Sequence, residues 1–141
     1  MAQSRPTHLA VIDLGNAPTG LHAAEAIRDA LQPKAEAPSG REFAVIDRDQ
    51  TRAAALGAGF EGSLNLTIQQ ARDLGAAMGC DFYFIGEAQT LRRSPSTEPF
   101  YYESYATVFL VSARTGRLVL WERPTAQRDA SAESEKALLA I

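Results

Sequence analysis

The chain has 141 residues with 17 acidic and 14 basic side chains, which gives a net charge of −3. This length is typical of one domain, so residues 1–141 are expected to share a single core. The basic residues are scattered, which argues against nucleic-acid binding, because that function needs clustered cations. No apolar run reaches the roughly 20 residues that a membrane-spanning helix requires, so no transmembrane segment is expected.

Strand and helix patterns alternate in the first half of the chain. Residues 8–14 are apolar and β-branched, which predicts a buried strand that ends near Asp13. Residues 21–31 carry apolar side chains at helical spacing and predict a helix. A second strand is expected at 43–47, followed by a short helix that Asp49 caps.

The best-marked helix begins after Thr67. Thr67 with Gln70 three residues later forms a capping-box pattern, and Leu66 is placed to pack as a hydrophobic staple. Gly79 is expected to end this helix, because glycine readily adopts the left-handed conformation that follows a helix.

The second half of the chain is dominated by strand patterns. A third strand is expected at 80–91, and a polar loop follows it. Residues 101–112 alternate as a long strand, and a turn at 114–116 leads into a strand at 117–122. A polar link then precedes a last helix at 130–141.

The element order β-α-β-α-α-β-β-β-α predicts an α/β fold with a mixed, roughly five-stranded sheet and helices packed on it. The first three strands are separated by helices, which indicates right-handed parallel crossovers. The last three strands have shorter connections, which indicates an antiparallel meander. The core is expected over about residues 7–123.

No catalytic pattern is coherent, so no enzyme activity and no cofactor are expected. The spacing Gly15-x4-Gly20 suits a phosphate loop, but no lysine follows it. The only two histidines, His8 and His22, lack a nucleophile or a metal-ligand spacing. Cys80 is the only cysteine and lies in an apolar run, where a thiol usually serves as a small core side chain.

Three acidic residues lie at or near the ends of the first three strands. Asp13, Asp47 and Glu87 are therefore expected at the edge where open α/β sheets bind ligands. One interpretation is a Mg²⁺ or small-ligand site in an enzyme. The alternative, which the missing partner residues favour, is that these acids cap strand ends and pair with Arg48 or Arg92.

Aromatic and basic residues gather in and after the loop at 92–99. Arg92 and Arg93 begin this loop, and Tyr101, Tyr102 and Tyr105 follow it. Such residues suit strand packing, a protein or peptide partner, or stacking on bases. If the chain presents a partner-binding surface, these five residues are predicted to form it.

Five sequence blocks occur in a fixed order that resembles a known group of domains. The blocks are 11–14 (VIDL), 20–31, 43–48 (FAVIDR), 79–86 (GCDFYFIG) and 110–118 (LVSARTGRL). Together they resemble the N-terminal domain of TolB and the related CsgG-like and FlgO-like bacterial envelope domains. The resemblance covers about residues 8–122, and its motifs mark strand ends and turns rather than an activity.

The resemblance implies a non-catalytic, periplasmic domain that binds protein partners or joins an envelope assembly, including a homo-oligomer near a membrane. Two positions depart from the pattern, because Ser112 replaces an acid and Cys80 an alanine. Residues 1–4 lack the apolar segment of a signal peptide. The expectation is a periplasmic chain whose signal peptide has been removed; the alternative is a cytoplasmic protein in which the strand-end acids carry chemistry.

Overall fold

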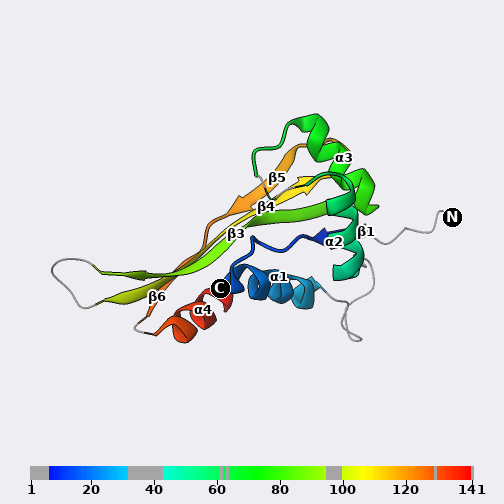
Figure 1. The fold of residues 1–141 in the computed structure, drawn as a ribbon. Coiled ribbons are helices and arrows are strands. Elements are labelled where there is room, and N and C mark those ends of the chain that lie inside the picture. Colours follow the sequence, from blue (N-terminus) through cyan, green and yellow to red (C-terminus); the bar gives the residue numbers. More distant parts are fainter. Residues whose placement is uncertain are drawn as a thin grey trace.

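The computed structural model describes residues 7–31, 43–60, 62, 64–94, 100–128 and 130–140. The expected loop at 33–41, part of the loop at 92–99 and residues 1–4 and 141 lie outside these ranges. The elements follow the chain (Figure 1) as β1 Thr7–Val11, α1 Pro18–Leu31, β2 Phe43–Val45, α2 Arg48–Gly57, α3 Ile68–Met78, β3 Phe82–Arg93, β4 Tyr101–Ser112, β5 Leu118–Glu122, β6 Thr125–Arg128 and α4 Ser131–Leu139.

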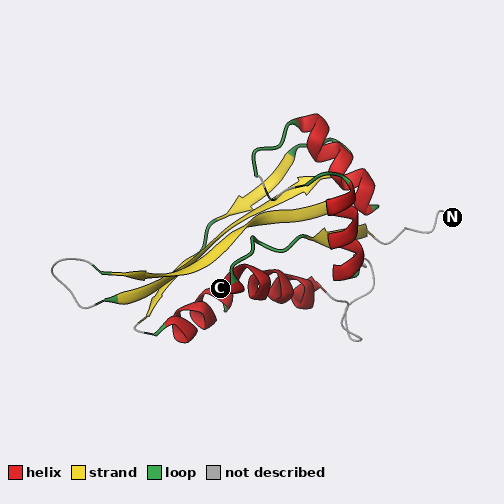
Figure 2. Ribbon diagram, in the orientation of Figure 1, coloured by secondary structure: helices red, strands yellow, loops and turns green. Residues whose placement is uncertain are grey.

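The strands form one mixed sheet, as the element order predicted. Its order is β2-β1-β3-β4-β5, and β6 also pairs with β4. β1 is parallel to both β2 and β3, while β4 is antiparallel to β3, β5 and β6. The long β3–β4 ribbon extends past the helices at one end of the molecule (Figure 2).

The polar link expected after residue 122 contains a sixth strand, which the sequence patterns did not predict. β6 pairs Thr125 with Tyr105 and Arg128 with Tyr102. Arg123 and Pro124 separate β5 from β6, and the carbonyl of Pro124 accepts a hydrogen bond from the amide of Ala106 at 3.1 Å. Only Ala126 of this strand is buried, so the sequence carries little apolar alternation by which to predict it.

Helices cover both faces of the sheet and create two cores. Successive β1 residues point to opposite faces, so Ala10 packs with α2 and α3, and Val11 packs with α1 and α4. Tyr83 of β3 is fully buried under α3, where its hydroxyl donates to the carbonyl of Ala71 at 2.7 Å. β3 and β4 therefore form a shared wall between the two cores.

The helix boundaries test the predicted caps. The capping box of α3 is present, and Gly79 ends the helix with a φ of 67°. The cap predicted for α2 was wrong by two residues, because Asp47 rather than Asp49 is the N-cap. The carboxylate of Asp47 accepts the amide of Asp49 at 3.1 Å and that of Gln50 at 3.4 Å, and so satisfies amides that the helix leaves free.

Two glycines allow close backbone contacts around β3. A Cβ on Gly86 would collide with the carbonyl oxygen of Thr107 on β4. A Cβ on Gly20, in the first turn of α1, would collide with the carbonyl of Leu14. Any larger residue would force the strands or the helix apart, so these glycines set two spacings in the fold.

A chain of hydroxyl groups joins α1 and α4 to the sheet. Thr19 on α1 contacts Thr90 at 2.7 Å, and Thr90 contacts Ser104 at 2.6 Å. Ser104 contacts Ser134 of α4 at 2.8 Å, and both serines are fully buried. This hydroxyl chain fixes the position of α4 on the sheet, because each buried hydroxyl needs its neighbour as a hydrogen-bond partner.

Candidate functional site

A cavity lies at the end of β1, where the connections that follow β1 and β2 cross opposite faces of the sheet. α1 follows β1 on one face of the sheet, and α2 follows β2 on the other, so a crevice opens beside the ends of β1 and β3, as in other open α/β sheets. The cavity has a volume of about 580 Å³. Its lining comes from the end of β1, from α1, α2 and the loop after α2, and from β3, and includes Ile12, Asp13, Leu21, Arg28, Arg48, Thr51, Arg52, Ala55, Leu56, Phe60 and Ile85.

Asp13 is the acidic residue among the described lining of this cavity, and two arginines form hydrogen bonds with it. Arg28 donates to its Oδ1 at 3.0 Å, and Arg48 donates to its Oδ2 at 3.2 Å. Arg28 also donates to the carbonyl of Val11 at 2.6 Å. Burial alone would raise the pKa of Asp13, but the hydrogen bonds and charges of Arg48 and Arg28 outweigh it, so the pKa lies below its ordinary value.

The described structure does not bring the three strand-end acids together into one group of ligands. Asp47 caps α2, whereas the carboxylate of Glu87 accepts a long hydrogen bond of 3.4 Å from the hydroxyl of Tyr105. Within the described ranges, no three His, Cys, Asp or Glu side chains are placed to hold a metal ion. Asp13 instead pairs with Arg48, as the alternative interpretation predicted.

Arg28 and Arg52 line the cavity but were not predicted from the sequence as site residues. Arg28 is only 8% exposed and lies four residues after Ala24 on the buried stripe of α1. An arginine on an apolar helix stripe was the available signal, because such a residue needs a buried partner. Arg52 is exposed and makes no hydrogen bond or ion pair with the described residues, and its sequence context gave no signal.

The predicted aromatic and arginine surface is split between two faces of the β3–β4 ribbon. Arg92 pairs in register with Tyr102, and its guanidinium lies 4.2 Å from the ring centroid of Phe100. Arg93 lies on the opposite face, because side chains alternate along a strand. There it forms an ion pair of 3.1 Å with Glu103.

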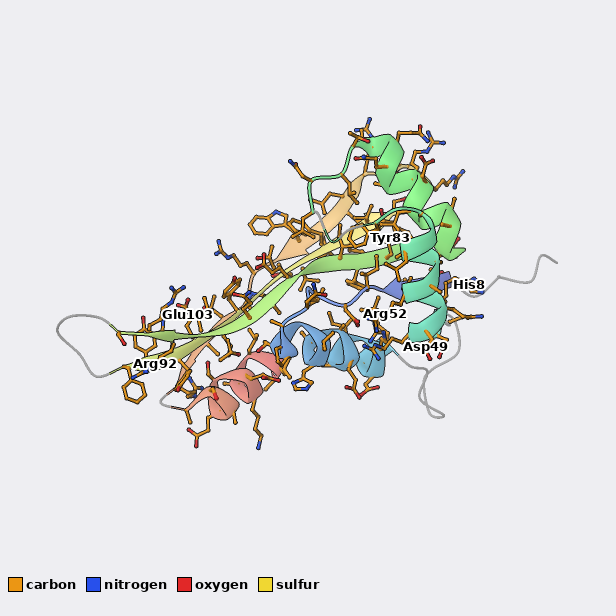
Figure 3. All side chains as sticks on the ribbon, viewed as in Figure 1. His8, Asp49, Arg52, Tyr83, Arg92 and Glu103 are labelled. Atoms are coloured by element: carbon orange, nitrogen blue, oxygen red, sulfur yellow. The ribbon has the colours of Figure 1, made fainter. Side chains whose placement is uncertain are left out.

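Tyr101 and Tyr105 share the face of Arg93 rather than that of Arg92. Burial and the neighbouring Glu87 raise the pKa of Tyr105. Figure 3 shows Arg92 and Glu103 near the far end of the ribbon, well separated from Arg52 on α2. The five residues therefore lie on two opposite faces of the ribbon. Arg92, at the far end of the ribbon, is also distant from the cavity residue Arg52.

The edge strand β5 exposes apolar side chains. Every residue of β5 is exposed, and the exposed fractions are 51% for Leu118, 51% for Val119, 43% for Leu120 and 58% for Trp121. Half of the eight large, exposed apolar residues in the described part belong to this strand. Because β5 ends the sheet, one side of its backbone has no neighbouring strand among the residues that the structure describes.

Cys80 is partly buried against the α2–α3 core, and its thiol contacts the carbonyl of Gly75 at 3.7 Å. Burial raises the pKa of this thiol to about 12, so the group remains protonated at neutral pH and is a poor nucleophile. Among the described helices, none combines the length and apolar character needed to cross a membrane.

Comparisons with known proteins identify the fold but no family. No protein-family model matches the chain. A search of curated proteins also gives no match. Several solved structures share the fold at low sequence identity.

Three of these structures come from bacteria. Lipoprotein GNA1162 from Neisseria meningitidis is 12% identical, with a TM-score of 0.57 over 96% of this chain and 94% of the other. The LpoB C-terminal domain from Salmonella enterica is 17% identical, with a TM-score of 0.54 over 86% and 83%. The PelC dodecamer from Paraburkholderia phytofirmans is 12% identical, with a TM-score of 0.52 over 99% and 86%. The chain therefore has the α/β fold of these three proteins.

Proposed function

We propose that the chain is a non-catalytic, periplasmic domain of the bacterial cell envelope that associates with other proteins, and that β5 is the contact. The exposed apolar edge strand carries this proposal. Soluble proteins usually protect sheet edges with charges, prolines or covering segments, and β5 carries instead the run Leu118, Val119, Leu120 and Trp121.

A second copy of the same chain is the partner that fits this edge best. Two β5 strands can pair antiparallel across a two-fold axis, which brings identical apolar residues together and satisfies the free backbone groups of both. The fold is also found in PelC, which is a dodecamer. Its occurrence in lipoprotein GNA1162 supports the envelope location.

Sedimentation analysis across a concentration series tests this proposal. The wild-type chain should gain mass as concentration rises. Trp121→Lys should weaken association about tenfold or more, because a central tryptophan commonly dominates an interface and a charge there would be desolvated. Ala53→Lys is the matched control, since it adds the same charge at an exposed position of α2 and should not change association.

A wild-type chain that stays monomeric at every concentration would contradict self-association. In that case, capture of envelope proteins by the wild type and by Trp121→Lys would test a different partner. Equal capture by both would contradict β5 as the contact.

The tyrosine and arginine residues of the β3–β4 ribbon remain a second predicted surface. The face of Tyr101 and Tyr105 is tested by the double variant Tyr101→Ala with Tyr105→Ala in the same capture experiment. The opposite face is tested by Arg92→Ala with Tyr102→Ala. Unchanged capture by both variants would contradict a binding role for this surface.

A further inference from the structure

We propose that the cavity beside the ends of β1 and β3 binds a small organic anion, with a carboxylate or phosphate head group and a short apolar portion. This site is independent of the β5 edge, because no β5 residue lines the cavity. Its position is the one at which open α/β sheets commonly hold ligands.

The charge of the lining favours an anion. Three arginines and one aspartate are found among the described lining residues, so this described part of the wall carries a net charge of +2. Asp13 is shared between Arg28 and Arg48, which leaves part of their positive charge uncompensated. Arg52 has no ion-pair partner among the described residues.

The arginines of the lining keep N–H donors with which they can bind an anion. A guanidinium group has five N–H donors, and Arg48 directs only its Nε and one Nη2 toward Asp13. Its other Nη group and the whole guanidinium of Arg52 remain able to donate. A carboxylate or phosphate can accept from two such groups at once. Glu25 and Asp49 also lie near enough to act on Arg48, but neither lines the cavity.

Two buried donors of the lining lack an acceptor. The Nε of Arg28 and the hydroxyl of Thr51 are inaccessible and have no hydrogen-bond partner in the described part of the protein. Thr51 is 1% exposed and Arg28 is 8% exposed. Both atoms are covered, so they reach a bound acceptor only if their side chains rotate toward the cavity, and the direct contacts of the ligand fall to Arg48 and Arg52.

Much of the remaining wall is apolar and would contact the apolar portion of the ligand. Leu21 of α1, Leu56 of α2, Phe60 after α2 and Ile85 of β3 line this part of the cavity. Leu56 is 68% exposed, so a ligand would cover apolar surface that is now in contact with water. A bare inorganic ion would leave this surface unused, whereas a short hydrocarbon chain would fill it.

Titration by NMR with four probes tests the proposal. The probes are hexanoate, hexyl phosphate, hexanol and inorganic phosphate. The two charged six-carbon probes should shift the amides of residues 12–16 and 85–86, and they should bind about tenfold or more tightly than hexanol, because charged hydrogen bonds are lost with the alcohol. The tighter of the two identifies the head group.

A substitution in the cavity wall tests whether the probes bind in the cavity. Arg52→Gln should weaken the charged probes about tenfold and leave hexanol unchanged. Arg114→Gln is the matched control, because this exposed arginine lies in the turn before β5 and does not line the cavity. Neither change removes a contact of the described residues, so both variants should keep the wild-type amide spectrum.

Three results would overturn the inference. Hexanol and hexanoate binding with equal affinity would exclude recognition of charge. Inorganic phosphate binding as tightly as hexyl phosphate would exclude the apolar part. Arg52→Gln and Arg114→Gln behaving alike, or shifts that fall outside the cavity, would exclude this location.

Discussion

At the residue scale, Asp13 and Arg28 form the main electrostatic contact of the interior. Their side chains are 18% and 10% exposed, and both are largely removed from water. A buried ion pair contributes little beyond an apolar pair of the same shape, but the loss of one partner leaves the other charge uncompensated. The contact therefore makes the protein sensitive to any change that removes the carboxylate.

Asp13→Asn is expected to reduce the free energy of unfolding by about 3 kcal/mol at neutral pH, because Arg28 loses its buried counterion. Chemical denaturation followed by circular dichroism measures this change. Arg48→Gln is a useful comparison, because the Arg48 side chain is 44% exposed and its loss should cost less. Equal losses for both variants would contradict the dominant role of Arg28.

The same contact predicts a pH dependence. The pKa of Asp13 is lowered in the folded protein, so the folded state binds this proton less readily than the unfolded chain, whose value is near 3.8. The stabilisation is complete above that value and is lost as the pH falls through the lower folded pKa. Stability measured from pH 5 downward should fall less steeply in Asp13→Asn than in the wild type. If the two curves of stability against pH were parallel, protonation of Asp13 would not affect the stability of the fold, and this prediction would be wrong.

At the scale of elements, α4 is attached to the sheet by hydroxyl groups as well as by apolar contact. The hydroxyl of Ser134 contacts that of Ser104. It is also within hydrogen-bonding distance of two carbonyl oxygens to which it can donate, those of Tyr102 at 3.0 Å and Ala126 at 3.2 Å. Leu138 supplies the buried apolar contact of the same helix. The position of α4 therefore depends strongly on one buried serine.

Ser134→Ala is expected to lower the free energy of unfolding by about 1–2 kcal/mol, because Ser104 loses one of its two hydroxyl partners. Amide hydrogen exchange should rise mainly in α4, since the helix would open locally more often. Lys136→Ala, an exposed change in the same helix, is the control. Uniform exchange changes across the whole chain would contradict a local role.

The elements differ in how far sequence predicts them. The capping box of α3 and the full extent of β4 were predictable, because each depends on local side-chain chemistry or alternation. β6 was not, because its hydrogen bonds come from β4 and its own residues carry no apolar pattern. The same holds for the site: Asp13 was predicted from its strand end, whereas its contact with Arg28 depends on how α1 packs.

At the scale of the whole molecule, stability is expected to be concentrated in the β3–β4 ribbon between the two cores. Amides near Tyr83, Ile85 and Val111 should exchange slowest in a dilute, monomeric sample, because both faces and both edges of these strands are covered. The outer amides of β5 should exchange much faster. If β5 were equally protected in dilute solution, the edge would not be open and the contact proposed for it would be contradicted.

The two close backbone contacts have an evolutionary consequence. At Gly20 and Gly86 the neighbouring atoms belong to the backbone, so changes in surrounding side chains cannot make room for a larger residue. Most other positions can drift while the fold persists, in keeping with the shared fold at 12–17% identity. Distant relatives should therefore retain glycine at these two places after their other sequence similarity has been lost, which makes the pair a search signature for the lineage.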